Sequence, residues 1–496
     1  MARNSARQFR RSAAQLHALA SVERTISAAD TVSRCRYLKE YSEAFQTYES
    51  VLMPGELDDD LRPADIILIG DYHALSAAQA YAASILDRLS HMSSRPVLFC
   101  LEAVLARDQR ILDEWFRNEI EIEELRERIR FDQDWGYDWR PYRELLESAR
   151  KVAAGVFGID CPPRSDMRTI ARRDRHASLK IAQLREQYPE AVIVVLFGES
   201  HLAPNHLPAL LRNARPADRV LTILQNVDSL YWQAAGEPGE SVGAVRVGDG
   251  VVCAFTSTPL EKYENYRLYI EQWQRERPSA PDMAPSFYNL IESLTRFLNF
   301  PVSGIQSLQS LPEVSCTRNH RLIRNRLARV GMSTVESDSV LSSLRFRGSC
   351  YVAEVRTIFA FRFLMPEAAE EAARFVHHAC QTDSASFSDG RERSAEDEFY
   401  VQVIDEAVAY LGSKILCPGR VVTCVPNAAL RLGQMLATRI YLAYVAGKIS
   451  KRFLRSVFCT PIRRPGAARV LYFSAVSILN GERKRSSATQ AAQMVS

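Results

Sequence analysis

Residues 191–201 read AVIVVLFGESH, seven apolar residues followed by Gly198 and, three positions later, His201. Residues 65–73 read DIILIGDYH and repeat the pattern, with a glycine again three positions before His73. An unbroken apolar run rich in β-branched residues is typical of a strand buried on both faces of a parallel sheet. Glycine at the end of such a strand lets the backbone come close to a ligand. The two phrases therefore predict two buried strands, each followed by a histidine.

The same kind of apolar run recurs between the two phrases and after them. Further runs occupy residues 96–102, 153–160, 220–224 and 250–255. The segments between the runs have helical periodicity and lengths that suit crossover connections. Alternation of buried strands with helices predicts an α/β domain with a mainly parallel sheet, which we place at residues 59–276.

The rest of the chain has the patterns of helices and connections. Residues 1–58 carry helical patterns, and the proline-broken stretch at 277–286 predicts a linker. After it, residues 287–480 are mostly helical in period, and the polar residues 481–496 predict a disordered tail. We therefore expect an α/β domain followed by a mostly α-helical C-terminal region.

The composition is that of a globular protein, with 47% hydrophobic residues, 25% charged residues and a formal charge of +4. The ten cysteines form no C-x-x-C pair, so we expect neither a zinc cage nor a disulfide-dense fold. The sequence has no run of about 18 uncharged apolar residues, no secretory signal pattern and no lipoprotein-type cysteine near its start. We therefore expect a cytoplasmic protein that is not an integral membrane protein.

Charge is distributed unevenly along the chain. No acidic residue lies between Glu406 and Glu482, whereas basic residues recur throughout residues 414–469. This stretch predicts an electropositive face for an anionic surface or an acidic protein partner. No aromatic–basic reading motif accompanies it, so we expect no specific nucleic-acid partner.

Ionisable side chains follow several predicted strands at the same end. Tyr72 and His73 follow the first strand, Glu102 follows the second, and Glu199 and His201 follow the fourth. Because the carboxyl ends of parallel strands meet at one edge of a sheet, we expect these side chains to line one crevice.

Two imidazoles and two carboxylates allow a small set of chemistries. They can hold a divalent metal ion with an open position for water, or one histidine can act as a general base that a carboxylate orients. A histidine or a tyrosine can also bind haem iron. The sequence contains no G-x-S-x-G elbow, Walker A loop or G-x-G-x-x-G motif. Serine hydrolases of the α/β type, P-loop enzymes and ordinary dinucleotide dehydrogenases are therefore disfavoured.

Two further segments offer contacts to a ligand. The aromatic residues between Trp135 and Tyr142 predict either a wall of the crevice or a part of the core. In RRDRHA at residues 172–177, the arginines beside Asp174 either aim one guanidinium at an anionic group such as a propionate or form an exposed face of a crossover helix, and Arg172 is the candidate for the ligand contact.

Several of these stretches resemble the ChaN-like family, which belongs to a superfamily of haem-binding uptake proteins, Tiki-type metalloproteases and erythromycin-esterase-like hydrolases. The resemblance covers about residues 60–275 and is carried by LIGDYHALSAAQ (68–79), LFCLEAVLARDQ (98–109), DWGYDWRPYRELLESAR (134–150) and LFGESHLAP (196–204). It implies binding of haem or iron, as in ChaN-like proteins, or hydrolysis, as in the Tiki and esterase branches.

Carried over by motif, the resemblance implies one set of shared catalytic or metal-binding residues. These are His73, Glu102, Glu199 and His201. We expect Tyr72 and Arg172 to contact the cofactor. The first hypothesis is a protein that binds haem or a divalent metal ion in this crevice. The alternatives are a hydrolase of an ester- or amide-like small substrate, with a metal ion or a histidine base, and a catalytically silent interaction scaffold.

Overall fold

The structure, a computed structural model, describes residues 17–24, 36–53, 55–92, 94–164, 170–234, 242–273, 282–300, 311–382, 394–417, 420, 427–462 and 464–480. The chain divides into two compact units. Among the described residues, the first unit runs from 36 to 270, and the second comprises residues 17–24 together with 271–480. Residues 17–24 therefore belong to a different unit from the strand–helix region that follows them.

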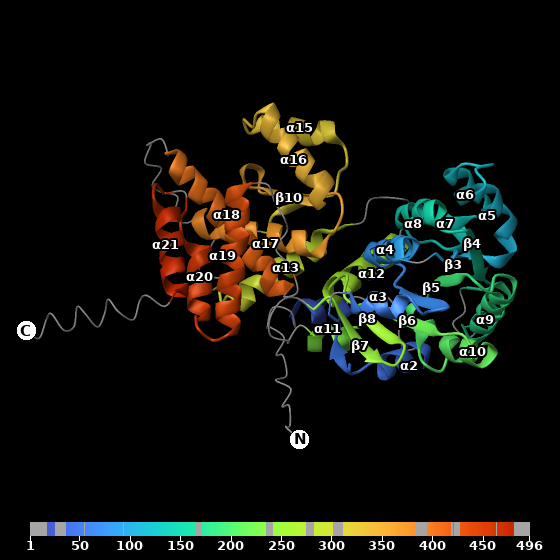
Figure 1. The fold of residues 1–496 in the computed structure, drawn as a ribbon. Helices are drawn as coiled ribbons and strands as arrows, with labels where there is room; N and C mark the ends of the chain where they lie inside the picture. Colours follow the sequence, from blue (N-terminus) through green and yellow to red (C-terminus); the bar gives the residue numbers. More distant parts are fainter. Residues whose placement is uncertain are drawn as a thin grey trace, which may run out of the picture. The chain divides into compact units, whose positions relative to one another are not determined.

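The first unit contains an eight-stranded sheet in the order β1-β7-β8-β6-β2-β5-β3-β4 (Figure 1). The strands are β1 (Ser50–Val51), β2 (Ile66–Asp71), β3 (Val97–Leu105), β4 (Gly155–Asp160), β5 (Val192–Gly198), β6 (Val220–Gln225), β7 (Ala244–Gly248) and β8 (Val251–Ala254). The pairings among β2, β3, β4, β5, β6 and β8 are parallel. At one edge β7 pairs antiparallel with both β1 and β8. The predicted α/β fold with a mainly parallel sheet is confirmed.

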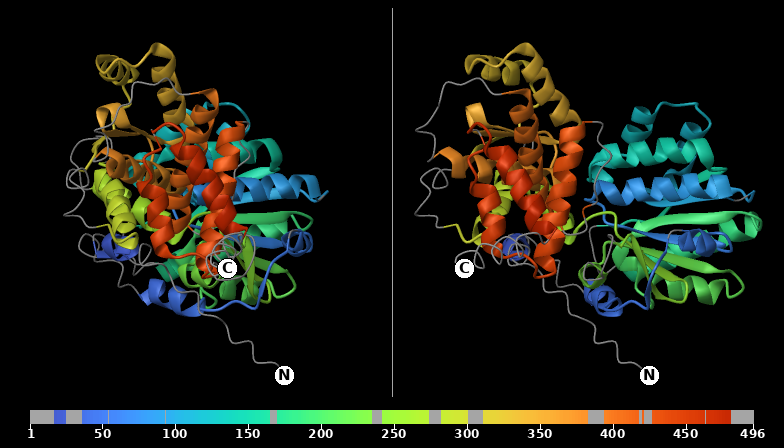
Figure 2. Two further views of the ribbon diagram at one scale, coloured as in Figure 1. Left: turned by 90° about the vertical axis from the view of Figure 1, so that its left-hand side faces the viewer. Right: turned by 60° about the vertical axis from the view of Figure 1, so that its left-hand side comes forward.

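Helices cover both faces of this sheet (Figure 2). One face packs against α4 (Ser76–Met92), α5 (Gln109–Phe116) and α8 (Trp139–Val152), and the other against α2 (Arg36–Ala44), α9 (Ile170–Gln187) and α10 (Leu207–Ala214). Successive residues of a strand point to opposite faces, so Ile67 and Ile69 of β2 enter one core while Ile66 and Leu68 enter the other. Because both faces are buried, the strands appear in the sequence as continuous apolar runs.

The other helices of the first unit lie in its connections, except that α12 follows the last strand and ends three residues beyond residue 270, the last of the first unit. They are α3 (Glu56–Leu61), η2 (Ala106–Asp108), α6 (Ile122–Arg128), α7 (Phe131–Asp134), η4 (Glu199–Leu202), α11 (Asp228–Ala234) and α12 (Pro259–Trp273). 

The strand order brings the ends of three strands together. β2 leads through α4 to β3, but β5, which comes later in the chain, lies between β2 and β3. The carboxyl ends of β2, β5 and β3 are therefore adjacent at one edge of the sheet. Such an edge is where open α/β sheets bind their ligands.

The second unit is mostly helical, as predicted. Its helices are α13 (Ala284–Phe297), α15 (His320–Arg329), α16 (Thr334–Arg347), α17 (Met365–Thr382), α18 (Ala395–Leu416), α19 (Ala428–Val445), α20 (Lys451–Cys459) and α21 (Ala467–Leu479). It also contains a three-stranded sheet that the sequence did not predict, formed by β9 (Glu313–Ser315), β10 (Ser349–Val352) and β11 (Thr357–Ala360) in the order β10-β11-β9.

In the parts of the chain that the structure describes, no helix has the length and apolar character needed to cross a membrane. The predicted tail, 481–496, lies outside the described residues, as do residues 277–281 of the predicted linker.

Candidate functional site

Three of the predicted site residues converge beside Gly198, the last residue of β5. A Cβ atom added at Gly198 would lie 3.1 Å from Glu102 Oε2, 3.2 Å from His73 Nε2 and 3.3 Å from His201 Cδ2. One imidazole faces each carboxylate oxygen, because His73 Nε2 is 3.9 Å from Oε2 and His201 Nε2 is 3.8 Å from Oε1. The structure thus brings His73, Glu102 and His201 into one site at the adjacent ends of three strands.

Glu102 is the buried anion at the centre of this site. Arg173 of α9 donates to its carboxylate, as does the backbone N–H of Gly198 at 2.5 Å. Burial raises the pKa of the Glu102 carboxyl, but Arg173 and the two histidines outweigh that effect and lower it to about 2. Asp160, the last residue of β4, accepts two further hydrogen bonds from Arg173, each of 2.9 Å. Glu102 is therefore ionised at neutral pH, with a counter-charge whose position is fixed.

His73 is held in one orientation and is 19% exposed to solvent. Its Nδ1 is 2.9 Å from Asp71 Oδ2, and Asp71 also accepts a hydrogen bond of 2.7 Å from the Tyr142 hydroxyl. Burial lowers the pKa of His73, but the carboxylates of Asp71 and Glu102 more than compensate, so the pKa lies above its usual value. The Asp71 contact leaves Nε2 as the nitrogen that faces the centre of the site.

An aromatic wall adjoins His73. The rings of Trp135 and Tyr137 have centroids 4.5 and 5.0 Å from the imidazole centroid. Tyr137 stacks on Tyr269 of α12, with centroids 4.2 Å apart and an interplanar angle of 14°. The guanidinium of Arg164 lies 4.7 Å from the centre of the Trp135 ring. The wall therefore combines flat apolar surfaces with one cation.

His201 is buried on the other side of Glu102. Its Nδ1 is hydrogen-bonded to Asp174 of α9, and its ring packs edge-on against Phe197 at a centroid distance of 4.6 Å. Each histidine is thus paired at Nδ1 with an aspartate and turns Nε2 toward Glu102. The site contains two Asp–His pairs around one carboxylate.

Glu199 and Tyr72 belong to a neighbouring cluster around Lys262 of α12. Lys262 Nζ lies 2.9 and 3.1 Å from the two carboxylate oxygens of Glu199, and 4.6 Å from the centre of the Tyr72 ring. Burial lowers the pKa of Lys262, but the Glu199 carboxylate raises it beyond its usual value. The carboxylate of Glu199 is therefore engaged by a buried lysine.

Arg172, which the sequence placed at the cofactor, is exposed on α9, and its guanidinium donates to the carbonyl oxygen of Pro162. The next residue, Arg173, enters the site instead, because one step along a helix turns a side chain by about 100°. Sequence reasoning selected Arg172 from the stretch that also contains Arg173 and Asp174, and it did not assign Lys262 to the site. The charged pattern at 172–177 indicates that this helix borders the site, but it does not indicate which face of the helix is buried. No local sequence pattern indicates that Lys262 contacts the site.

The metal-ion alternative has no preassembled ligand group among the described residues. No three His, Cys, Asp or Glu side chains in that part of the chain are placed to hold an ion. Glu102 is already bonded to Arg173, so metal binding at His73, Glu102, Glu199 and His201 stays a prediction that requires this pair to separate.

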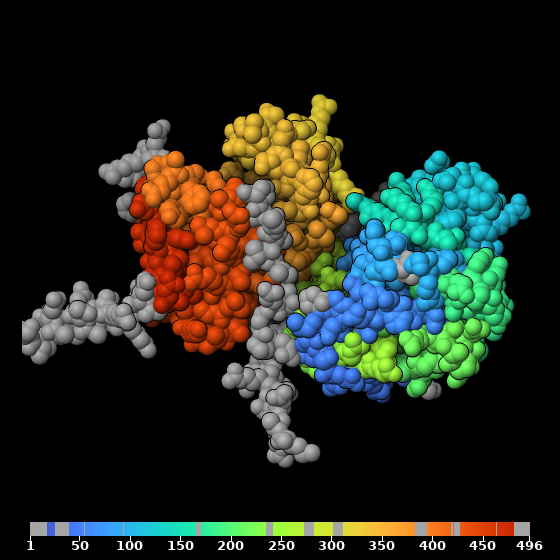
Figure 3. Space-filling view, in the orientation of Figure 1, coloured from blue at the N-terminus to red at the C-terminus, as the bar shows by residue number. Residues whose placement is uncertain are grey.

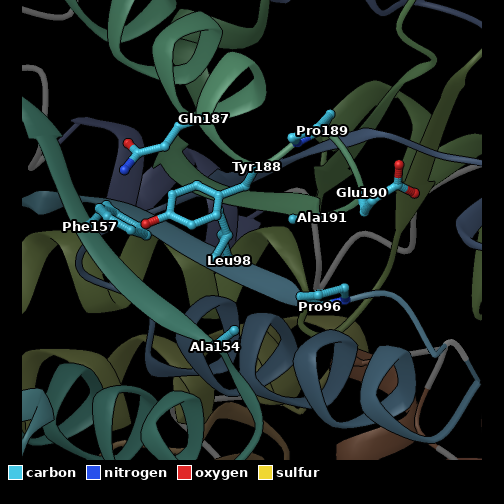
Figure 4. A pocket seen from close by; sticks show the side chains of 9 residues that line it. All are labelled: Pro96, Leu98, Ala154, Phe157, Gln187, Tyr188, Pro189, Glu190 and Ala191. Atoms are coloured by element: carbon cyan, nitrogen blue, oxygen red, sulfur yellow. The ribbon is translucent and has the colours of Figure 1, made fainter.

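A cavity of about 300 Å³ lies elsewhere in the first unit (Figure 4). Pro96, Ala154 and Ala191, which immediately precede β3, β4 and β5, line it beside Tyr188. These residues mark the amino ends of the strands, whereas the histidines follow the carboxyl ends. The cavity is therefore not part of the histidine site.

Residues 57–194 match the family described as "Haem-binding uptake, Tiki superfamily, ChaN". The matched segment contains Tyr72, His73 and Glu102 and ends within β5. A solved structure described as "Cofacial heme binding to ChaN of Campylobacter jejuni" is similar at 15% sequence identity, with a TM-score of 0.29, over 40% of this chain and 91% of that chain. No curated protein sequence matches the chain.

Proposed function

Because residues 57–194 carry a domain of the haem-binding uptake family, we propose that the first unit binds haem at the carboxyl edge of its sheet. The observation that supports this most directly is His73, a partly exposed imidazole beside an aromatic wall, with Nδ1 held by Asp71. In this proposal His73 Nε2 is the ligand of the haem iron.

The side chains around His73 suit an iron porphyrin. An imidazole whose Nδ1 is held by a carboxylate presents Nε2 to a metal in a fixed orientation. His73 Nε2 lies 3.9 Å from Glu102, beyond hydrogen-bond range, so this carboxylate does not occupy its lone pair. The rings of Trp135 and Tyr137 are apolar surfaces of the kind a macrocycle contacts, and because Trp135 is 7% exposed and Tyr137 is stacked on Tyr269, they would have to move apart to admit one. When bound, haem supplies the iron, and the protein supplies the ligand atom, its orientation and a low-polarity wall.

Two further contacts belong to this proposal. Tyr72 lies next to the site on the loop after β2, and the exposed guanidinium of Arg172 suits a propionate carboxylate. Tyr72→Phe and Arg172→Gln are expected to weaken haem binding less than loss of the His73 imidazole does, because neither removes the proposed iron ligand.

Titration of the full-length protein with haemin, followed by Soret absorbance, tests the proposal. His73→Ala is expected to weaken binding by at least about 10-fold, because it removes the ligand atom. His91 on α4 provides a matched control, since its side chain is 75% exposed and His91→Ala is expected to bind haem as the wild type does. Equal affinities of the wild type and His73→Ala would contradict the assignment of His73. No saturable Soret change in the wild type would contradict the function.

Hydrolysis of an ester- or amide-like small substrate is the second candidate, and the two Asp–His pairs favour it. In each pair a carboxylate holds Nδ1 and so orients the imidazole, as in enzymes that use histidine as a general base. His73, the more exposed of the two histidines, is the proposed base, and its Nε2 would accept a proton from an attacking water molecule.

Hydrolysis of a p-nitrophenyl ester by chelator-treated protein, with and without added Mn²⁺, Zn²⁺ or Co²⁺, tests the second candidate. A general base contributes about 10²–10⁴-fold, so His73→Ala is expected to lower the rate by at least that lower bound. A rate that depends on the added ion supports the metal-dependent form, and a rate that does not supports the histidine base. If neither haem nor any ion binds and no ester is cleaved, the first unit is a silent scaffold.

A further inference from the structure

Residues 313–360 of the second unit have the element order of a helix–turn–helix with a β-hairpin wing. β9 is followed by α15, a short turn and α16, and then by the antiparallel hairpin of β10 and β11. β11 pairs in parallel with β9, which completes the sheet in the order β10-β11-β9. In Figures 1 and 2, α15 and α16 lie beside each other at one end of the second unit. We refer to residues 313–360 as the wing module.

The wing module has a hydrophobic core of its own. The buried residues of that core are Ile323 and Leu327 of α15, Val340, Leu341 and Leu344 of α16, Val352 of β10 and Phe359 of β11. Because both helices and both hairpin strands contribute, the two helices are held against the hairpin as one body. In the space-filling view the module forms a gold lobe of the second unit (Figure 3).

The connection between α15 and α16 has the features of a helix–turn–helix turn. Four residues, 330–333, separate the helices, and Gly331 has a φ of +86°, which favours glycine. Ser333 then starts α16 with a capping box, in which its side chain accepts from the Glu336 N–H and the Glu336 carboxylate accepts from the Ser333 N–H.

The charge of the region is strongly positive. Residues 311–362 contain nine arginines, no lysine and four acidic residues. Asp338 is paired with Arg324 at 2.7 Å and Glu313 with Arg326 at 2.6 Å, and each pair neutralises one arginine together with one acid. Arg347 is paired with Glu370 of α17, so six of the nine arginines are outside these pairs. An excess of arginine on a small module is the electrostatic signature of a surface that binds nucleic-acid phosphates.

Three of the arginines gather at the C-terminal end of α16. Arg318 Nη2 donates to the carbonyl oxygen of Phe361 at 3.1 Å, Arg362 Nη2 donates to that of Arg345 at 3.0 Å, and Arg345 lies 3.5 Å from His320 Nδ1. Carbonyl oxygens and an imidazole thus position these guanidinium groups, which keep their positive charge available to an anion. We call Arg318, Arg345 and Arg362 the arginine cluster.

The outward face of α16 is uncovered along its whole length. Val335 and Phe346, near its two ends, are each 80% exposed, and Ser339 and Ser342 lie between them on the same side at helical spacing. Arg345, which belongs to the arginine cluster, lies along one edge of this face together with Asp338, whose carboxylate is paired with Arg324. The exposed face of α16 therefore adjoins the arginine cluster.

We propose that the wing module binds duplex DNA, with the outward face of α16 in the major groove and the arginine cluster on the phosphate backbone. The major groove of B-form DNA admits an α-helix, and in helix–turn–helix proteins the second helix lies there. The sequence alone predicts no specific nucleic-acid partner, because no aromatic–basic motif accompanies its basic residues. The proposal rests instead on the topology, the exposed helix and the arginine cluster.

Fluorescence anisotropy of the full-length protein with a labelled mixed-sequence DNA duplex of about 25 base pairs, at salt concentrations from about 50 to 200 mM, tests the proposal. Each phosphate contact contributes about 0.9 to the slope of log affinity against log salt. Arg318→Gln combined with Arg345→Gln is expected to reduce that slope by about 2 and to weaken binding at low salt by at least about 10-fold. Ser342→Glu is expected to abolish binding, since it places a negative charge on the groove-facing side.

A matched control uses exposed arginines of the other basic stretch. Arg431→Gln combined with Arg452→Gln, on α19 and α20, is expected to leave both affinity and slope unchanged. A control that lowers the slope while the Arg318 and Arg345 variant does not would overturn the proposal, because the binding surface would then be α19 and α20. If the wild-type protein shows no salt-dependent binding to the duplex, the proposal is also overturned.

An RNA duplex of the same sequence tests the groove assignment. The major groove of A-form RNA is too narrow for a helix, so binding to RNA is expected to be at least about 10-fold weaker. Equal affinity for the two duplexes would overturn the placement of α16. Circular dichroism of every variant separates loss of contact from loss of folding.

Discussion

Gly198 is in close contact with the three central residues of the histidine site, whereas Gly70, the glycine of the other G-x-x-H motif, is not. A Cβ at Gly198 would meet Glu102, His73 and His201 at 3.1–3.3 Å, whereas a Cβ at Gly70 would have its nearest neighbour at 3.4 Å, an ordinary contact. Gly198→Ala is therefore expected to destabilise the first unit by about 1–3 kcal/mol and to displace the ligand atom of His73. Gly70→Ala is the matched control, with a smaller effect. Thermal unfolding and haemin titration of both variants check this, and equal effects would contradict it.

Glu102 makes a pH-dependent contribution to stability whose sign follows from its pKa. Arg173 and the histidines outweigh burial and lower the pKa from 4.5 to about 2, so the stabilisation is present above pH 4.5 and is lost as the pH falls toward 2. Glu102→Gln is expected to lower the free energy of unfolding by roughly 2–3 kcal/mol at neutral pH. The gap between the variant and the wild type should close between pH 4.5 and 2. Urea unfolding across this range measures it, and a gap independent of pH would contradict the assignment.

At the scale of elements, α18 packs so closely against its neighbours that two contacts require glycine. A Cβ at Gly412 of α18 would collide with the Cβ of Ala373 on α17, and a Cβ at Gly433 of α19 would lie 2.6 Å from the carbonyl oxygen of Val403 on α18. Helix propensity alone would make Gly433→Ala stabilising by about 1 kcal/mol. A net loss of about 1–3 kcal/mol is expected instead, because the backbone of α18 must shift. Thermal unfolding decides the sign, and a raised transition temperature would contradict the close packing.

At the scale of the whole molecule, residues 17–24 are part of the second unit although they precede the first. His17 Nδ1 is 3.0 Å from Ser293 Oγ, Asn289 donates to the carbonyl oxygen of Ala18 at 3.0 Å, and Leu19 and Val22 are buried. Deletion of residues 1–30 is therefore expected to destabilise the second unit by a few kcal/mol, since it removes the buried side chains of Leu19 and Val22 from that unit. Scanning calorimetry and haemin binding check this. An effect confined to the first unit would contradict the division.

Much of the fold of the first unit can be predicted from the sequence, and so can the centre of its candidate site. The six apolar runs became β2, β3, β4, β5, β6 and β8, because a strand buried on both faces has a continuous apolar signature. Since those strands are parallel, the residues that follow them had to share an edge, and the structure places His73, Glu102 and His201 there. The wing module gave no comparable signal, because its strands have only three or four residues each.

The sequence by itself determined which residues lie at the carboxyl edge of the sheet, because strand identity and direction are local properties of the apolar runs. Only the tertiary structure decided what those residues do to one another. Whether Arg172 or Arg173 faces Glu102 depends on the rotation of α9 on the sheet, which packing sets and periodicity alone does not. Lys262, which donates to Glu199, lies 63 positions later in the chain, and no local sequence pattern indicates this contact. The pairing of each histidine with its aspartate, and the charge state of Glu102, follow from these long-range contacts.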